Sequence, residues 1–531
     1  MKKKLVIILC ILFAIGCKKT DVAKVTPPPV AEVKVPKLLT NDITGLTFYS
    51  VVFGGKILDS AGEKITEYGF VVDTVTAPTT VKNFKQVPIT IRNSDGSFIL
   101  NVGDLPSSVT YYLRAYAINA NGTGYGNEVK FTTKNQKIYE GNVNLATQQE
   151  VIDFGSNGYT MINGALNISG SVTDLTPLLG LAIINAGFTM TGAQVVNFKG
   201  LDSLEITGAI FPNNFFVERN PLLTSFKGLA KLRITRGIFQ INKNSSLVNF
   251  EGLDSYVAAS AGQMGIYENE KLQNLNGLKH FEFVGSDFYI SNNPSLTDIS
   301  GLANLSQVYG RIYIINNAML PNLHGLEKIT NLEGGIEIDN NPVLNNLDGI
   351  QNLATASSSA GRGAINIDGN PMIADLSVFK NIVAVDYMNI KNNSGLKDLS
   401  GLKNLEKINQ VLHIENNPLL KDLSGLEKLS SIARLEIFDN DGLVNLHGIS
   451  SITKIAGNGS SLLIWNNDNL TSLTGIEHLV TADGSVQITL NKSLTDFCAL
   501  KPLFNNGYNN FFFNANNAVN PTQDEILANC Q

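Results

Sequence analysis

A repeat of about 24 residues constrains the fold of this 531-residue chain more than any other feature. Each copy carries an asparagine followed three residues later by an apolar residue, and successive asparagines are 23 to 29 residues apart. These asparagines are Asn220, Asn244, Asn269, Asn293, Asn317, Asn341, Asn370, Asn393, Asn417, Asn440, Asn467 and Asn491. Two degenerate copies, with Gly170 and Gly192 at the asparagine position, extend the repeat upstream to about residue 163. One copy cannot bury its apolar face alone, so the copies have to stack into a solenoid.

The copy from Leu412 to Ile432 shows how each repeat is built. Leu412 and Ile414 alternate with polar residues, which predicts a strand with one face turned inward. The leucines that follow at intervals of three suit turns that return each side chain to the same core. We therefore expect a mainly β fold of parallel strands stacked about 4.8 Å apart. Each buried asparagine amide should bond to the backbone of its own turn and to the neighbouring copies.

Asn-Asn-Pro turns, as at Asn416–Pro418, and Gly-Leu corners, as at Gly425–Leu426, give this region a resemblance to known repeat families. It resembles bacterial leucine-rich repeats and the receptor L domain family. The resemblance covers roughly residues 140–531 and implies a right-handed parallel β-helix, with the repeats themselves at 163–497. Solenoids of this kind serve many ligands, so the resemblance predicts an architecture and no single function.

Both ends of the solenoid carry the signature of a capping helix. We place an N-terminal cap at 140–162 and a C-terminal cap at 498–531. Thr147 is followed three residues later by Glu150, and the same Thr-x-x-Glu pattern recurs at Thr522. Such caps would cover the open ends of the stacked strands.

The N-terminus reads as an export signal at residues 1–16. Lys2–Lys4 form its basic part, and Leu5–Ala14 form an apolar run that is too short to span a bilayer. The junction of small residues that ends at Cys17 resembles the lipobox of bacterial lipoproteins. That resemblance implies that Cys17 is lipidated and becomes the first residue of the mature chain, tethered to a membrane.

Between the lipid and the repeats we expect a spacer and a second domain. Residues 17–36, rich in Lys, Thr, Val and Pro, predict a flexible linker. Residues 37–134 alternate short apolar runs with turn signals, which predicts a β-sandwich. Leu105–Pro106, the run Thr110–Ala117 and Phe131–Thr133 resemble the closing strands of fibronectin type III domains. The resemblance implies a spacer or a binding module.

The four cysteines predict one disulfide bond. Cys10 leaves with the export signal and Cys17 takes the lipid, so Cys498 and Cys530 remain as a pair in an oxidising compartment. The bond would hold the C-terminal cap and contribute about 3 to 4 kcal/mol of stability.

No constellation of residues predicts catalysis, a metal site or a cofactor. The five histidines are scattered along the chain. Asp439–Gly442 resembles the start of a calcium loop, but it lacks the glutamate at the twelfth position and lies in register with the turn at Asn416–Pro418. Charged residues make up 16 % of the chain and the formal net charge is −6, which disfavours nucleic acid as a partner. We expect a protein that is not an enzyme.

The candidate ligand-binding residues come from the two strand positions on either side of Ile414 and its equivalents, which should face solvent. Because the copies stack, the equivalent residues of successive strands line up in two columns. The columns contain two aromatic clusters. Between these clusters lies an acidic band with Glu337, Asp339, Asp368, Glu415 and Glu436. The candidates are Tyr267, Tyr289, Tyr313, Ile315, Phe438 and Trp465. Exposed aromatic side chains on a rigid sheet anchor protein partners and sugars. The alternative is that they only pack along their own column and favour strand formation.

We therefore expect a non-catalytic, membrane-anchored lipoprotein that acts as a cell-surface adhesin or ligand-binding protein through its solenoid face. The alternatives are a glycan-binding lipoprotein of a nutrient-uptake system and a structural envelope spacer. The combination of sandwich and repeats resembles envelope lipoproteins of the Bacteroidetes group, which implies the outer membrane and favours the cell surface. Lys18 and Lys19 depart from the acidic residues that follow the lipidated cysteine in that group, so the periplasmic face remains an alternative.

Overall fold

A computed structural model describes residues 34–46, 50–90, 92–103, 105–209, 213–357, 361–457 and 459–530. The chain forms two compact units, residues 1–135 and 136–531. The expected export signal, Cys17 and all but the last three residues of the 17–36 linker lie outside the described residues. In the part that is described, no helix is long and apolar enough to cross a membrane.

The N-terminal unit is a β-sandwich, as predicted. Two antiparallel sheets enclose a core in which the ring of Phe53 lies 5.5 Å from that of Phe70, and Tyr111 stacks on Phe131 at 5.6 Å. One sheet contains β1 (Lys37–Thr40), β2 (Ser50–Asp59) and β5 (Ser97–Gly103). The other contains β3 (Glu67–Asp73), β4 (Lys85–Pro88), β6 (Thr110–Asn119), β7 (Gly122–Tyr125) and β8 (Val129–Thr132).

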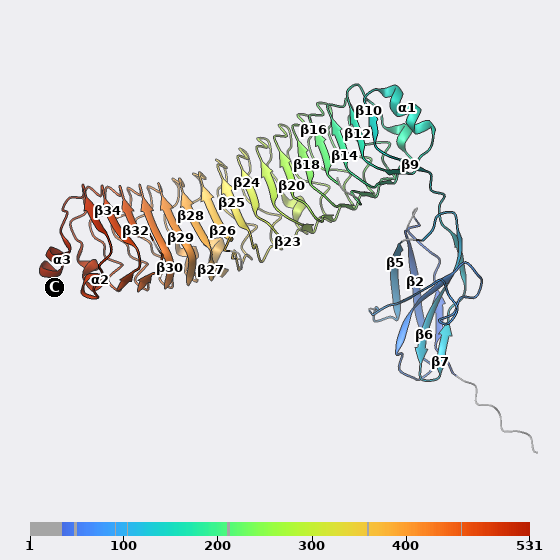
Figure 1. Ribbon diagram of the computed structural model, residues 1–531, viewed down its shortest axis with the longest axis horizontal. Helices are drawn as coiled ribbons and strands as arrows, with labels where there is room; N and C mark the ends of the chain where they lie inside the picture. Colours follow the sequence, from blue (N-terminus) through green and yellow to red (C-terminus); the bar gives the residue numbers. More distant parts are fainter. Residues whose placement is uncertain are drawn as a thin grey trace, which may run out of the picture. The chain divides into compact units, whose positions relative to one another are not determined.

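The second unit is a right-handed parallel β-solenoid of about 15 turns, which confirms the predicted fold class (Figure 1). One strand of each turn joins a long parallel sheet that we call the main sheet. Its strands are β10 (Val143–Leu145), β12 (Leu166–Ser169), β14 (Phe188–Thr191), β16 (Phe215–Glu218), β18 (Phe239–Asn242), β20 (Met264–Tyr267), β22 (Phe288–Ser291), β24 (Ile312–Ile315), β25 (Gly335–Asp339), β26 (Ala364–Asp368), β28 (Tyr387–Lys391), β29 (Lys407–Glu415), β30 (Ser431–Phe438), β32 (Ser460–Trp465), β34 (Ser485–Thr489) and β35 (Phe512–Ala515).

In most turns a short strand precedes the strand of the main sheet, and these short strands form a second row of parallel pairings. They are β9 (Ile138–Glu140), β11 (Met161–Asn163), β13 (Ile183–Ile184), β15 (Ile206–Thr207), β17 (Ile234–Thr235), β19 (Ala258–Ala259), β21 (Phe283–Val284), β23 (Gln307–Val308), β27 (Ala384–Val385), β31 (Lys454–Ile455) and β33 (Thr481–Ala482). In β29 and β30 the short strand and the main strand are continuous, so these two strands join the rows.

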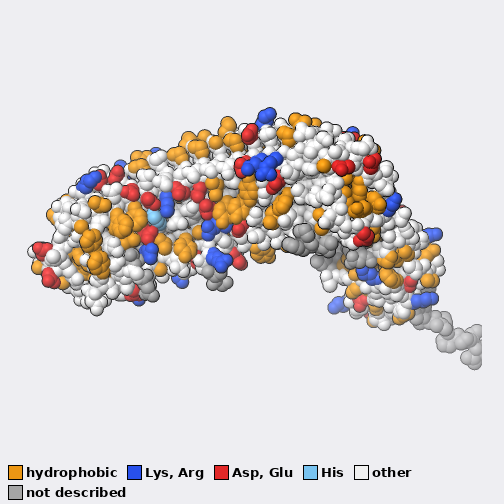
Figure 2. Space-filling view, turned by 45° about the horizontal axis from the view of Figure 1, so that its top comes forward, with side chains coloured by type: hydrophobic (Ala, Val, Ile, Leu, Met, Phe, Trp, Pro, Cys, Tyr) orange, Lys and Arg blue, Asp and Glu red, His pale blue; other side chains and the backbone are white. Residues whose placement is uncertain are grey.

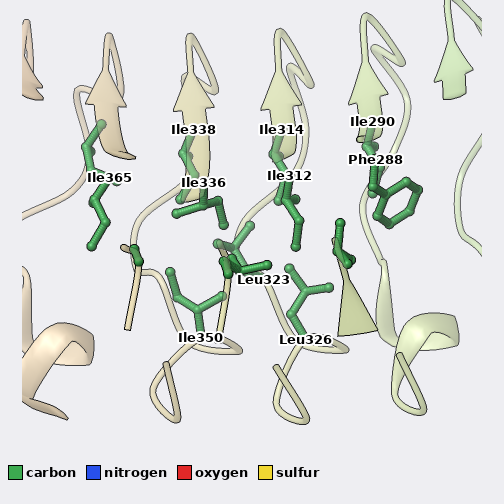
Figure 3. Close-up of a cluster of buried hydrophobic side chains, with 14 of the residues drawn as sticks. Phe288, Ile290, Ile312, Ile314, Leu323, Leu326, Ile336, Ile338, Ile350 and Ile365 are labelled. Carbon is green, nitrogen blue, oxygen red and sulfur yellow. The ribbon is translucent and has the colours of Figure 1, made fainter. Parts of the chain in front are cut away.

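The core is built from the alternation that the sequence predicts. Ile312 and Ile314 of β24 are fully buried, whereas Tyr313 between them is only half-buried (Figure 3). Leu323 and Leu326 reach the same core from the turns of their coil. Replacing one such leucine by alanine typically costs about 2 to 5 kcal/mol, because the closely packed neighbours cannot fill the cavity.

The repeated asparagines form a buried ladder between neighbouring turns. The Nδ2 of Asn317 donates to the carbonyl oxygens of Ile290 and Ile315, at 2.9 and 3.2 Å. Its Oδ1 accepts the backbone N–H of Asn293, at 3.3 Å, and its own N–H donates to Oδ1 of Asn341. Each asparagine thus forms hydrogen bonds with its own turn and with both neighbouring turns, as predicted.

The register of the two degenerate copies corrects our alignment by one residue. The N–H of Ala193 donates to Oδ1 of Asn220, at 2.9 Å, so Ala193 and not Gly192 stands at the asparagine position. Gly192 has a φ of 67° and Gly170 a φ of 63°, and both occupy the preceding left-handed position, where Arg219 has a φ of 53°. Glycine is favoured at that position because it lacks a Cβ.

Helices occur at the ends and corners of the solenoid. They are α1 (Gln148–Ser156), α2 (Lys501–Asn505) and α3 (Gln523–Asn529), with 3-10 turns η1 (Thr176–Leu178), η2 (Ser300–Leu302), η3 (Ser377–Asn381), η4 (Ser400–Leu402) and η5 (Cys498–Leu500). Both predicted capping boxes are present, at Thr147 with Glu150 and at Thr522 with Glu525. The Cys498–Cys530 disulfide is also present and ties the end of α3 to η5.

Candidate ligand-binding face

The solvent side of the main sheet, here called the main face, carries the two predicted columns in register. Tyr289 pairs with Tyr313 and Tyr313 with Glu337 in one column. Phe438 pairs with Trp465 in the other. Neighbouring side chains of a column are about 4.8 Å apart, because that is the spacing of adjacent strands. Figure 2 shows hydrophobic side chains gathered in patches on the solenoid, with acidic and basic side chains between them.

Tyr267, Tyr289 and Tyr313 are brought together as one contiguous group, which we call the tyrosine row. The rings of Tyr289 and Tyr313 stack face to face, with centroids 4.4 Å apart and planes 4° apart. Tyr267 packs against Tyr289 at 5.7 Å with a tilt of 53°. All three side chains are half-buried, so their ring faces are largely covered by one another.

The tyrosine row depends on a glycine that the sequence analysis did not single out. Tyr267 belongs to the second column, but its ring lies over Gly265, two residues earlier in β20. A Cβ at position 265 would stand 2.2 Å from Cε2 of Tyr267. Gly265 is the one residue without a side chain in a column that continues with Tyr289 and Tyr313. That gap was the available signal that a neighbouring ring fills the space.

The hydroxyls of the tyrosine row remain protonated at physiological pH. Burial, and then the charge of Asp287, raise the pKa of Tyr267 to about 12. The same two causes raise the pKa of Tyr289, whose hydroxyl donates to Oδ2 of Asp287 at 3.1 Å. The row therefore presents neutral phenol edges and hydroxyl groups to solvent.

Arg311 closes one end of the tyrosine row. Its guanidinium carbon lies 5.8 Å from the ring centroid of Tyr313, within the range of a cation–π contact. The same guanidinium donates to Oε2 of Glu337 at 3.2 Å and to the carbonyl oxygen of Arg362 at 3.1 Å. Arg362 lies 51 residues later, shortly before β26, so this bond brings the backbone at Arg362 beside the row.

The three longest turns of the solenoid have their extra residues at the same corner. Their extra residues lie between β15 and β16, between Ala356 and β26, and between β31 and β32, in each case just before a main-sheet strand. The second of these is anchored by buried Asp386, whose carboxylate accepts the hydroxyl of Ser357 at 2.9 Å and the N–H of Gly363 at 2.8 Å. Insertions in repeat proteins often map to the binding face, and here each one is followed directly by a strand of the main sheet.

The acidic band begins beside the tyrosine row, where Glu337 and Asp339 lie on the same side of β25. Asp368 pairs in register with Asp339, and Asn366 donates to both carboxylate oxygens of Asp339 at 3.1 and 3.3 Å. Burial and the nearby carboxylates of Glu337 and Asp368 raise the pKa of Asp339 to about 8. The fold therefore favours the protonated form of Asp339.

A second part of the acidic band surrounds His413. Nδ1 of His413 lies 3.0 Å from Oε2 of Glu436. Its Nε2 lies 2.9 Å from Oε2 of Glu415, although outside hydrogen-bonding geometry. Hydrogen bonding to His413, together with the nearby positive charge of Arg434, lowers the pKa of Glu436. Arg434 and Lys391 form ion pairs with Glu436 and Glu415, at 3.2 and 3.7 Å, which balance part of the negative charge here.

Phe438 and Trp465 form the second aromatic group, with stacked rings 5.0 Å apart. Trp465 is 36 % exposed, whereas Leu463, which pairs in register with Glu436 and Gln487 on the same outward side of the sheet, is only 7 % exposed. Five strand spacings, roughly 24 Å, separate Tyr313 from Phe438, so the two groups are distinct sites. Ile315 is half-buried beside the tyrosine row, between Ser291 and Asp339.

Among the described residues, no group of three or more His, Cys, Asp or Glu side chains is arranged to hold a metal ion. The structure thus gathers five of the candidate aromatic residues into two contact groups and places Ile315 beside the first. Cys17 lies outside the described residues. No protein-family model matches the chain, and no curated protein matches it.

Proposed function

We propose that this protein is a non-catalytic, membrane-anchored lipoprotein whose main face binds a macromolecular partner, as an adhesin or ligand-binding protein of the cell surface. The observation that carries the proposal is the tyrosine row: three contacting tyrosines on a rigid sheet, held in place by Gly265 and Arg311. Tyrosine, tryptophan and arginine are the residues that most often dominate binding energy at protein interfaces.

The stacking of the tyrosine row favours a protein over a sugar as its partner. A sugar ring packs on an open aromatic face, but the faces of Tyr289 are covered by Tyr267 and Tyr313. Phenol edges, hydroxyls and the adjacent Arg311–Glu337 ion pair remain available. Such a mixed polar and aromatic patch is typical of protein interfaces. Because the side chains are already packed, binding would cost little conformational entropy.

The lipid anchor is the second part of the proposal. It rests on the sequence that ends at Cys17, and the sandwich and the linker would lift the solenoid away from the outer membrane. Changing Cys17 to Ser should release the protein into the soluble fraction of cells, whereas the wild type should require detergent. Protease treatment of intact cells then tests exposure. Loss of the solenoid places it at the cell surface, and full protection places it on the periplasmic face.

Binding to defined surfaces tests the function itself. Purified protein is passed over immobilised fibronectin, fibrinogen, laminin and type I collagen, and binding is measured by biolayer interferometry. We expect at least one surface to bind wild type and to bind Tyr289→Ser/Tyr313→Ser at least tenfold more weakly. Tyr309→Ser is the matched control, because Tyr309 is 58 % exposed and packs on Phe283 of β21, outside the main sheet. Failure of all four surfaces to bind would favour the envelope spacer instead.

A further inference from the structure

The C-terminal end of the main face has a different chemistry from the rest. The outward positions of β25 to β30 include five acidic side chains, Lys391 and His413. The outward positions of the last three strands carry no charge. They are Leu463, Trp465, Gln487, Thr489, Phe513 and Ala515.

Trp465 presents one open ring face in this uncharged region. Phe438 stacks on the side of the indole that faces β30, with planes 20° apart. On the opposite side the column continues with Thr489 and then Ala515, whose side chains are too short to cover an indole. This differs from the tyrosine row, where Tyr289 has a ring on either side.

Aromatic and polar groups border the space above Thr489. Phe513 of β35 is 44 % exposed and stacks on Phe511, which is 62 % exposed. Gln487 lies in register between Leu463 and Phe513, and its Nε2 donates to Oγ of Ser485 at 3.0 Å. The Oε1 of Gln487 and the hydroxyl of Thr489 have no hydrogen-bond partner among the described residues and are free to bind a ligand. We call the region of Trp465, Gln487, Thr489, Phe513 and Ala515 the tryptophan shelf.

We propose that the tryptophan shelf binds a neutral pyranose ring of a glycan. The apolar C–H face of the sugar would pack on the open face of Trp465 at van der Waals distance, about 3.5 to 4.0 Å. At that distance it lies above β34, where its hydroxyls meet Gln487 and Thr489. The shelf offers no cation to an acidic sugar, so neutral sugars are favoured. This site is independent of the proposed function of the tyrosine row.

Tryptophan fluorescence reports ligand binding at the shelf directly, because Trp465 is the only tryptophan in the chain. Purified full-length protein is titrated with methyl β-glucoside, methyl β-galactoside, methyl α-mannoside and methyl N-acetyl-β-glucosaminide, and with glucuronic acid as the charged comparator. We expect a saturable blue shift with at least one neutral glycoside and an affinity for glucuronic acid at least tenfold weaker. The response should persist in Tyr289→Ser/Tyr313→Ser, which separates this site from the tyrosine row.

Two variants keep the tryptophan and test the geometry. Thr489→Phe fills the space against the open indole face and should weaken the response at least tenfold, whereas Thr489→Ser keeps the hydroxyl and should retain it. Gln487→Ala removes one polar partner at an outward position and should weaken the response several-fold even if Thr489→Phe fails to fold. The proposal is overturned if none of the four neutral glycosides changes the emission. It is also overturned if the response survives both Thr489→Phe and Gln487→Ala.

Discussion

The ring of Tyr267 occupies the space above Gly265, so the absence of one side chain positions another. We predict that Gly265→Ala displaces the Tyr267 ring, because the new Cβ would stand 2.2 Å from Cε2 of Tyr267. Overpacking of this kind costs about 1 to 3 kcal/mol. Denaturant unfolding measures that cost, and binding to the partner of the tyrosine row should weaken although all three tyrosines are still present.

Gly180→Ala is the matched control for this substitution. The atom nearest to a Cβ at position 180 is the carbonyl oxygen of Tyr159, at an ordinary 3.8 Å. Its stability should therefore stay within about 0.5 kcal/mol of wild type. If Gly265→Ala unfolds and binds like Gly180→Ala, the Tyr267 ring does not depend on the glycine.

The asparagine ladder predicts a large loss of stability for a small change. Asn317→Ala removes the donor to the carbonyls of Ile290 and Ile315 and the acceptor of the Asn293 N–H. Each buried group left unpaired costs about 1 to 3 kcal/mol, so we expect a total loss of at least about 3 kcal/mol. Exposed Asn345→Ala should change the free energy of unfolding by less than about 0.5 kcal/mol. Equal losses in the two variants, measured by urea unfolding, would contradict a structural role for the ladder.

The disulfide predicts a local effect at the C-terminal cap. Cys498→Ser/Cys530→Ser removes a disulfide bond between residues 32 positions apart in the sequence. Such a bond contributes about 3 to 4 kcal/mol to the stability of the folded state. Ile526 of α3 is the residue that buries this helix against the core, so α3 should exchange its amide hydrogens faster. Hydrogen-exchange mass spectrometry checks this, with β22 in the middle of the main sheet as the internal control. Unchanged exchange in α3 would show that packing alone holds the cap.

The raised pKa of Asp339 predicts a stability that falls as the pH rises. Burial and the neighbouring carboxylates favour the protonated acid in the folded state and raise its pKa from the ordinary value of 3.8 to about 8. Between these two values the unfolded chain loses the proton and the folded chain keeps it, so the folded state becomes relatively less stable. Asp339→Asn should therefore gain stability over wild type as the pH rises from 4 to 8.

Urea unfolding at several pH values measures this difference. A constant difference between wild type and Asp339→Asn from pH 4 to pH 9 would mean that Asp339 is ionised in the folded protein.

The sequence predicted the solenoid and both columns because a parallel stack converts sequence period directly into spatial register. The asparagines from Asn220 to Asn491 were placed by that period. The ladder continues one step further than we predicted, because the N–H of Asn491 donates to Oδ1 of Asn517 at 3.0 Å, inside the segment that we assigned to the C-terminal cap. Gly192 was misplaced because no side chain marks whether a glycine replaces the asparagine or the left-handed residue before it. The period alone did not place the Tyr267 ring over Gly265, since that position depends on side-chain rotation, and the glycine in the column was the one signal for it. Nor did the period place the contact between Arg311 and Arg362, which crosses 51 residues.

Photo-crosslinking from the main face tests the central claim most directly. The photoreactive amino acid p-benzoylphenylalanine is introduced at Ile315, beside the tyrosine row, or at Tyr309, which packs on β21 outside the main sheet. Each protein is then irradiated with a partner identified in the binding assay. Our account predicts a cross-linked product from position 315 and little or none from position 309. Cross-linking from position 309 alone would contradict the assignment of the main face as the binding surface.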